Sequence, residues 1–125
     1  MEQIQWQYLF NPSLAIDSLP YVLEGLWNTL FISFTSMIFG LLLGLFLALG
    51  RSSANWLLRL PSSLYISFMR GVPILVILFI LYFGFPVIGI EFTAIQAAVL
   101  GFSLNSAAYI AEINRSAIKA IEHGQ

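Results

Sequence analysis

The sequence predicts an all-α integral membrane protein. Hydrophobic residues make up 59% of the 125 residues and charged residues only 9%, whereas a soluble domain carries about 25% charged residues. Three uncharged stretches, residues 25–50, 71–90 and 92–111, are long enough to cross a hydrocarbon layer of roughly 30 Å as helices. We therefore expect three transmembrane helices.

The distribution of basic residues predicts the orientation of these helices. Threading the three spans in order leaves all five Lys and Arg residues on or near one side of the membrane: Arg51, Arg59, Arg70, Arg115 and Lys119. Cytoplasmic loops collect Lys and Arg, so the basic side is the cytoplasm. The prediction is an N-terminus outside and a C-terminus in the cytoplasm.

Composition excludes several function classes. The chain has no cysteine, which excludes disulfides, thiolate metal sites and cysteine nucleophiles. Its five basic residues are scattered and its net charge is −1, so no nucleic-acid surface is expected. No nucleophile–base pair, phosphate-binding glycine loop or metal-ligand spacing occurs, and the single histidine, His123, is expected to be solvated. We expect no catalytic residue, no metal and no cofactor.

Residues 1–20 are expected to form an outer interfacial segment. Trp6, Tyr8 and Phe10 suit the headgroup level of a bilayer, where amphipathic rings are favoured. Pro12 and Pro20 are expected to interrupt this segment. The first residues lack the basic start of a cleaved signal peptide, so the first span is expected to act as an uncleaved insertion signal.

The first span, about residues 21–49, carries a stripe of small and hydroxyl residues. At 100° per residue these residues share one narrow face: Thr29, Ser33, Ser36, Gly40, Gly44 and Ala48. The four-residue spacing from Gly40 through Gly44 to Ala48 lets helix backbones approach closely, which predicts helix packing there. A second possibility stays open for Thr29 and Ser33, namely that their hydroxyl groups face a water-filled path.

The second span, about residues 61–84, is expected to bend. Residues 51–60 are interpreted as a cytoplasmic link lying along the inner interface, with a new helix starting at Pro61. Pro73 removes a backbone N–H and clashes with the preceding turn. Arg70 lies about one turn before it, either as an interface anchor or as a charged group on a translocation path. Residues 84–89 are expected to form the outer turn, with Glu91 outside.

The third span, about residues 92–113, has one small and polar face. That face is predicted to carry Ala94, Ala97, Ala98, Gly101, Asn105, Ala108, Glu112 and Ser116, bordered by Tyr109. A lipid-facing side is predicted to carry Ile95, Val99, Phe102, Ile110 and Ile113. The mid-membrane amide of Asn105 needs a partner. It either bonds another helix or lines a polar conduit with Tyr109 and Glu112, and Glu112 alternatively only pairs with Arg115.

Three helices of this length enclose very little space. A substrate path normally needs more helices or a partner subunit. We therefore expect the sequence to oligomerise or to belong to a longer protein. The packing positions in such an assembly are predicted to be Gly40, Gly44, Ala48 and Gly101.

Three stretches resemble the permeases of amino-acid ATP-binding-cassette (ABC) importers. Residues 67–76, Ser-Phe-Met-Arg-Gly-Val-Pro-Ile-Leu-Val, followed by Tyr-Phe-Gly at 82–84, resemble the Arg-Gly-Thr-Pro segment of that family. Residues 103–115 are similar to its third core helix, and residues 19–30 fit its first helix. The resemblance covers residues 19–125, with Val72 and Asn114 as small departures.

The resemblance implies a transport subunit of the bacterial plasma (inner) membrane with several crossings. Such a permease forms part of the translocation path of an ATP-driven, binding-protein-dependent amino-acid importer, working by alternating access. Its implied partners are cytoplasmic ABC ATPase subunits, an extracytoplasmic solute-binding protein, a second permease subunit, the amino-acid substrate and membrane lipid. ATP hydrolysis would reside in the ATPase subunits, so the permease itself is not expected to be an enzyme.

The resemblance also implies that residues 21–125 are a partial permease domain. In that family Gly124 and Gln125 lead into a Glu-Ala-Ala coupling helix, which docks on the ATPase and is followed by about two more spans. The sequence is therefore expected to be incomplete. The alternative hypothesis is a small three-span membrane scaffold that binds partner helices and transports nothing.

Overall fold

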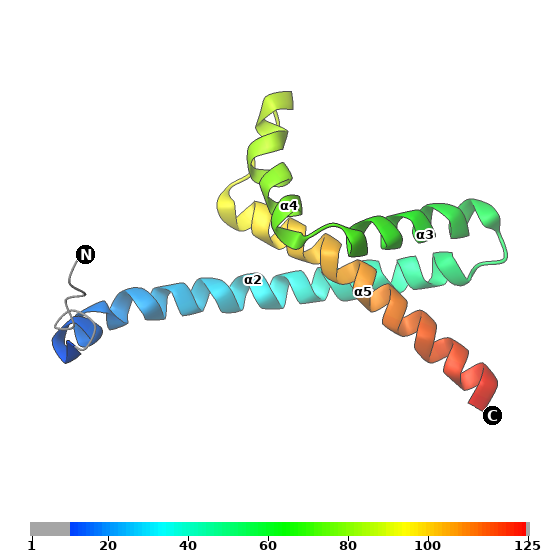
Figure 1. Cartoon of the computed structure of the whole chain (residues 1–125), viewed down its shortest axis with the longest axis horizontal. Helices are drawn as coiled ribbons and strands as arrows, with labels where there is room; N and C mark the ends of the chain where they lie inside the picture. Colours follow the sequence, from blue (N-terminus) through cyan, green and yellow to red (C-terminus); the bar gives the residue numbers. More distant parts are fainter. Residues whose placement is uncertain (1–10, 125) are drawn as a thin grey trace, which may run out of the picture. The chain divides into compact units, whose positions relative to one another are not determined.

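The computed structural model describes residues 11–124, and these residues are helical with short connections and no strand. The elements are the α-helices α2 (Pro12–Ser52), α3 (Trp56–Gly71), α4 (Ile74–Phe79) and α5 (Ala94–Gly124), the π-helix η1 (Ile80–Gly84) and the 3₁₀-helix η2 (Phe85–Ile88), shown in Figure 1. Helices α2 and α5 are long and apolar enough to cross a membrane, and α3 with α4–η2 makes a third crossing if that bent pair counts as one span. The all-α prediction is confirmed.

The chain divides into two compact units, residues 1–31 and 32–125. In the first unit, the described residues form the beginning of α2. The Asn11 side chain accepts hydrogen bonds from the Ser13 backbone N–H at 3.2 Å and from the Ser13 hydroxyl at 2.6 Å. This cap, with Pro12 at the first helical position, starts the helix.

This early start corrects the expected interruption at Pro12 and Pro20. The helix includes residues 12–20 and continues through Pro20, because Asn11 supplies a cap nine residues earlier than expected. The aromatic residues expected at the headgroup level, Trp6, Tyr8 and Phe10, lie outside the described residues.

The small-residue stripe is the buried face of α2 in the second unit. The buried residues of this helix are Ser36, Gly40, Gly44 and Ala48. The Ser36 hydroxyl donates a hydrogen bond to the Val99 carbonyl at 3.3 Å. Ser33 is exposed, and the Thr29 hydroxyl, in the first unit, donates to the Gly25 carbonyl of its own helix at 2.9 Å.

Helix α3 begins earlier than the sequence suggested. The Asn55 side chain accepts a hydrogen bond from the Leu57 N–H at 3.0 Å, which caps the helix at Trp56. Pro61 therefore lies inside α3, and the prediction that a helix starts at Pro61 is wrong. Residues 56–60, expected to be part of the link, are helical, and the link shortens to residues 53–55.

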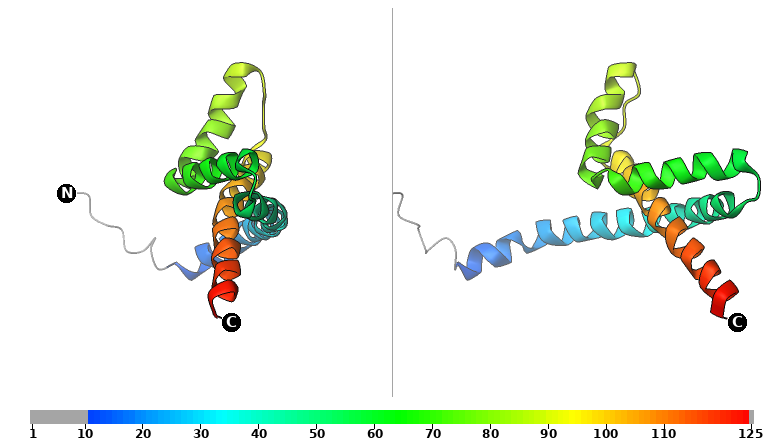
Figure 2. Two further views of the ribbon diagram at one scale, coloured as in Figure 1. Left: turned by 90° about the vertical axis from the view of Figure 1, so that its right-hand side faces the viewer. Right: turned by 45° about the vertical axis from the view of Figure 1, so that its right-hand side comes forward.

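The predicted break at Pro73 is confirmed. Helix α3 ends at Gly71, Val72 is extended, and Pro73 caps α4. The segments Trp56–Gly71 and Ile74–Ile88 meet at 102°, and Figures 1 and 2 show α4 turning away from α3. The turn after η2 closes at Gly89, whose φ of 85° lies in the left-handed region that favours glycine.

Helix α5 packs on both arms of this bend. It begins with a capping box: Thr93 Oγ1 accepts from the Gln96 N–H at 3.2 Å, and Gln96 Oε1 accepts from the Thr93 N–H at 3.0 Å. It ends at Gly124, eleven residues past the expected boundary. With its neighbours it forms two apolar clusters, one of Ala48, Ile66 and Ala111 and one of Ile77, Leu81 and Ala97.

The predicted lipid-facing side of α5 is only partly exposed. Ile95, Phe102 and Ile113 are exposed, but Ile110 packs against Gly44. A Cβ atom at Gly44 would lie only 2.8 Å from Ile110 Cγ2. Because α2 packs along a flank of α5, the buried face of α5 keeps Ala97, Gly101 and Ala108 of the predicted arc and extends to Ser103, Ala107 and Ala111. Ala94 and Ser116, predicted to lie on that arc, are exposed.

Candidate functional site

One carboxylate, in the interior of α5, lies among three arginines, two of which are at the ends of α2 and α3. Glu112 Oε2 is 2.7 Å from Arg51 Nη1 and 3.9 Å from Arg70 Nη1. Glu112 Oε1 accepts hydrogen bonds from Arg115 Nε, at 3.2 Å, and from Arg115 Nη2. We call these four residues the Glu112 cluster.

Local structure explains how the Glu112 cluster forms. Arg51 and Arg70 lie in the last turns of α2 and α3, where cations are stabilised by the negative end of the helix dipole. Glu112 and Arg115 lie one turn apart on α5. The buried contact of Ala48, Ile66 and Ala111 brings these helices close, because two of the three side chains are single methyl groups.

The Glu112 cluster carries an excess of positive charge. One carboxylate faces three guanidinium groups, and the exposed fractions of the Arg51, Glu112 and Arg115 side chains are 24%, 19% and 23%. Partly buried charges attract and repel more strongly than exposed ones. Glu112 is therefore the residue that holds the three arginines together, and it joins the ends of α2 and α3 to the interior of α5.

Arg70 has a second partner. Its guanidinium carbon lies 5.7 Å from the centroid of the Tyr109 ring, within the range of a cation–π interaction. Its side chain is more exposed than the others, at 44%. Arg70, Tyr109 and Glu112, three of the four residues considered for a path, thus lie together in the structure.

Asn105 lies apart from the Glu112 cluster. It is one turn before Tyr109 on α5 and is partly buried, and within residues 11–124 its amide forms no hydrogen bond. The polar contact between α3 and α5 at this level is made by Tyr65, whose hydroxyl donates to the Leu104 carbonyl at 2.8 Å. The described residues therefore do not give Asn105 an interhelical partner.

Sequence reasoning did not assign Arg51 or Tyr65 to this region. Arg51 directly follows the first uncharged stretch, and Glu112 directly follows the third. Both residues thus border a predicted span on the same predicted side of the membrane. This shared position was a signal from which an ion pair of Arg51 with Glu112 could have been predicted. Tyr65 gave no comparable signal, because its contact depends on the angle between α3 and α5.

The predicted packing glycines lie at close helix contacts. A Cβ at Gly40 would lie 3.0 Å from Ser106 Cβ, and one at Gly101 would lie 2.6 Å from Leu78 Cδ2. Gly124 is the last described residue, and Gln125 lies outside the described residues. Among residues 11–124, no group of three His, Cys, Asp or Glu side chains is placed to hold a metal ion.

Comparison with known proteins identifies the family. Residues 40–125 match the family described as binding-protein-dependent transport system inner membrane component. The chain belongs to this family. Members are components of the inner membrane, in agreement with the apolar helices of the structure.

Two relatives of this inner membrane component come from Bacillus subtilis (strain 168). The probable amino-acid ABC transporter permease protein YckA is 67% identical over 125 residues, covering the whole chain and 55% of YckA. The arginine transport system permease protein ArtQ is 43% identical over 114 residues, covering 90% of the chain and 52% of ArtQ. The chain thus spans about half the length of the curated relatives it matches.

A solved structure shows the same fold. The crystal structure of an amino acid ABC transporter with histidines matches with a TM-score of 0.84 and 37% sequence identity. The match covers 88% of this chain and 51% of the solved chain. The resemblance drawn from the sequence to amino-acid ABC permeases is confirmed by these comparisons.

Proposed function

We propose that this chain is part of the permease subunit of an ATP-driven, binding-protein-dependent amino-acid importer. The observation that carries the proposal is the 67% identity, over the entire chain, to a protein named as a probable amino-acid ABC transporter permease. In this proposal the chain forms one wall of a path for an amino acid. It carries out no bond chemistry and binds no ATP itself.

The proposed partners follow from this role. Two cytoplasmic ATPase subunits would drive alternating access, and an extracytoplasmic solute-binding protein would deliver the amino acid. A second permease subunit, identical or related, would complete a cavity that these helices are too few to enclose. Further segments, corresponding to the additional length of the relatives, would supply the contact with the ATPase.

The proposed topology has three crossings with the N-terminus outside. The gathering of basic residues supports it: Arg51, Arg59, Arg115 and Lys119 line one cavity, and Arg70 reaches Glu112. The 53–55 link and the end of α5 would then lie on the same side of the membrane. The positive-inside rule makes that side the cytoplasm.

The proposed path residues are Asn105, Tyr109, Glu112 and Arg70. Asn105, Tyr109 and Glu112 follow one another along α5 at spacings of four and three residues, and Arg70 contacts the last two. The 3.9 Å contact between Arg70 and Glu112 is the longest of the cluster. In this proposal it separates first when α3 moves relative to α5 and opens the path toward the cytoplasm.

Uptake by a reconstituted complex tests the proposal. The chain, fused to the remaining length of the 67% identical relative, is purified with the ATPase and solute-binding protein that serve that relative, and placed in proteoliposomes. We expect uptake of a radiolabelled amino acid that requires ATP and the solute-binding protein. A hydrolysis-deficient ATPase is the control.

The same assay addresses the scaffold alternative. Assembly of the full complex, shown by co-purification, without uptake of any of the common amino acids would contradict a transport role. It would favour the hypothesis of a membrane scaffold.

A further inference from the structure

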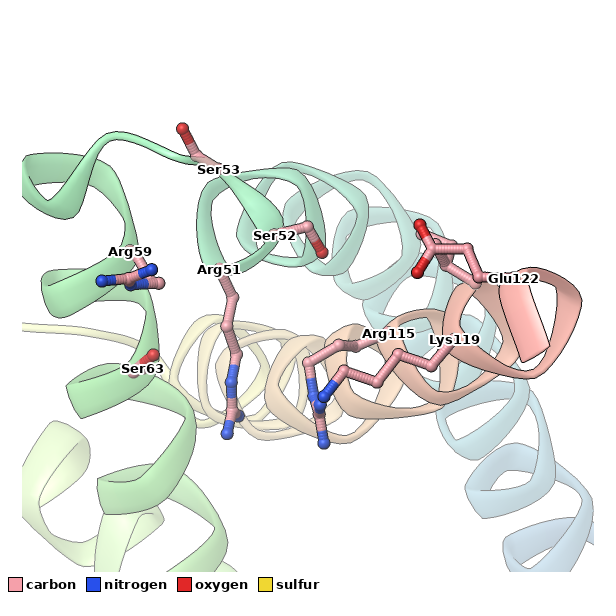
Figure 3. Close-up of a pocket in the computed structure, with 9 residues that line it drawn as sticks. Arg51, Ser52, Ser53, Arg59, Ser63, Arg115, Lys119 and Glu122 are labelled. Carbon is pink, nitrogen blue, oxygen red and sulfur yellow. The ribbon is translucent and has the colours of Figure 1, made fainter.

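A polar cavity lies beside the Glu112 cluster. It has a volume of about 380 Å³ and is formed by the end of α2, the first half of α3 and the last turns of α5 (Figure 3). Its lining residues are Arg51, Ser52, Ser53, Arg59, Ser63, Arg115, Ile118, Lys119 and Glu122. The proposed path uses none of these residues.

The charge of this cavity is strongly positive. Four cations line it against one carboxylate, Glu122, and Glu112 just outside it accepts from Arg51 and Arg115. Arg59 and Lys119 form no ion pair with any residue between 11 and 124. Figure 3 shows the charged ends of Arg51, Arg115 and Lys119 low in the view and Arg59 at the left, whereas the carboxylate of Glu122 lies higher, at the right. At least two positive charges are thus left without a carboxylate.

Hydroxyl groups complete a set of hydrogen-bond donors. Ser52, Ser53 and Ser63 contribute to the lining. The Ser53 oxygen accepts from the Asn55 N–H at 3.1 Å, which leaves its hydroxyl proton available to a ligand. Guanidinium groups, an ammonium group and hydroxyls together match the acceptor oxygens of a phosphate group.

The outer side of α3 indicates how a membrane would reach this cavity. Four large apolar side chains form one exposed stripe along α3: Leu57, Leu60, Leu64 and Phe68. Arg59 and Ser63 lie on the other side of the same helix, at the cavity. The cavity therefore lies on the opposite side of α3 from a face that suits contact with lipid. It is at the level where the membrane-spanning helix α2 ends. Basic pockets between membrane helices at this level bind anionic headgroups.

We propose that this cavity is a binding site for a phosphate-bearing anion, with Arg59 and Lys119 as the principal cations and the serine hydroxyls as donors. A phospholipid headgroup and a soluble phosphate share this chemistry. Arg51 and Arg115 stay with Glu112 and add positive potential. The proposal does not depend on the proposed transport function.

Binding of defined lipids tests the site. The chain is purified in a neutral detergent, and native mass spectrometry measures its retention of phosphatidylglycerol and of phosphatidylcholine with the same acyl chains. We expect preferential retention of phosphatidylglycerol. The double variant Arg59→Gln/Lys119→Gln is expected to weaken that retention about thirtyfold, because each of the two cations adds roughly 1 kcal/mol of attraction to anionic lipid near a membrane surface.

Two controls separate binding from folding. The variant Arg59→Lys/Lys119→Arg keeps both charges and is expected to retain phosphatidylglycerol. Circular dichroism of both variants is expected to show unchanged helicity. Equal retention of the two lipids by the unmodified chain, or unchanged retention of phosphatidylglycerol by the Gln variant, would overturn the proposal.

Competition distinguishes the two sources of phosphate. If millimolar inorganic phosphate displaces the lipid in a manner that requires Arg59 and Lys119, the site accepts a soluble anion. If phosphate does not displace it, the site needs a headgroup presented by the bilayer. Each outcome assigns a source to the same site.

Discussion

Glu112 is the one carboxylate within ion-pairing distance of Arg51, Arg70 and Arg115 in residues 11–124. Arg51 and Arg70 approach Glu112 from the ends of α2 and α3. Arg115 lies one turn after Glu112 on α5. Removing the charge of Glu112 does more than break three contacts, because it leaves three guanidinium groups close together in a partly buried position.

We predict that Glu112→Gln destabilises the fold by about 2 kcal/mol, the range seen for losing hydrogen bonds to charged groups. The amide keeps the size of the side chain but not its charge. Unfolding of the purified chain in mixed micelles, followed by circular dichroism, measures the change.

The matched control for this prediction is Glu122→Gln on the same helix. Glu122 is exposed and forms no ion pair with residues 11–124, so its neutralisation is expected to change stability by less than about 0.5 kcal/mol. Equal effects of the two substitutions would contradict the central role of Glu112.

Two glycines of α2 differ in their surroundings. A Cβ at Gly44 would lie 2.8 Å from Ile110 Cγ2, 2.9 Å from Ile110 Cβ and 3.0 Å from the Ala107 carbonyl oxygen, whereas nothing lies within 4 Å of one at Gly25. We predict that Gly44→Ala destabilises the chain by about 1–3 kcal/mol through overpacking.

Gly25→Ala provides the matched comparison within the same helix. It adds the same methyl group and is expected to be neutral or stabilising, because alanine has the higher helix propensity by about 1 kcal/mol. Thermal unfolding of both variants in one detergent measures the difference. A Gly44→Ala variant as stable as Gly25→Ala would show that α2 and α5 do not pack as described.

At the scale of helices, the sequence predicted which segments are helical better than it predicted the residues at which each helix begins and ends. The break at Pro73 follows from the missing N–H of proline, and the apolar stretches predicted the helices. Helices α2 and α3 begin at Pro12 and Trp56 because the side chains of Asn11 and Asn55 cap them. In the sequence, Pro20 and Pro61 instead indicated the starts of these helices. The Thr93–Gln96 capping box was readable from its spacing.

The packing faces of α5 were harder to predict. A helical wheel gives the relative directions of side chains but not which neighbour covers them. Ile110 was expected in lipid, yet it fills the space that Gly44 leaves. The Glu112 cluster was predicted only in part, since Arg115 is one turn away on the same helix while Arg51 arrives from 61 residues earlier in the sequence.

Pro73 lies at the break between α3 and α4, and the angle between these helices is open to direct measurement. We predict that Pro73→Ala extends the distance between these helices, because the restored N–H allows the helix to continue across residues 72–73. The chain has no cysteine, so spin labels at Ser67→Cys in α3 and Phe83→Cys in η1, which directly continues α4, report this change by double electron–electron resonance.

Pro61→Ala is the control for the bend. Helix α3 already runs through Pro61, so this substitution is expected to leave the labelled distance unchanged. The same distance distribution in the Pro73→Ala and Pro61→Ala variants would mean that contacts with α5, rather than the proline, set the 102° angle.

For the whole molecule, the 102° bend raises a definite question of topology. The bent pair is either one broken span or a re-entrant segment that returns to its starting side. The contact of Arg51 with Glu112 and the cavity shared by Arg59 and Lys119 place the 53–55 link near the end of α5. This arrangement fits three crossings, since a re-entrant pair would put these two parts on opposite sides of the membrane.

We predict that Ser53→Cys and Lys119→Cys react with a membrane-impermeant maleimide from the same side, and Glu91→Cys from the opposite side. Labelling of intact cells and of inverted vesicles measures this. The cysteine-free chain gives the background. Reaction of Glu91→Cys and Ser53→Cys from one side would establish the re-entrant alternative.

The order of residues on the buried stripe of α2 also determines the register of α2 along α5. Sliding α2 by one turn in one direction would bring Ser36 to the place of Gly40, where a Cβ lies 3.0 Å from Ser106 Cβ. Sliding it in the other direction would bring Ala48 to the place of Gly44, where a Cβ lies 2.8 Å from Ile110. With glycine only at the two middle positions, a one-turn shift in either direction brings a larger residue to a place with little space, so tilting or separating α2 and α5 disturbs their contact less than shifting one lengthwise past the other.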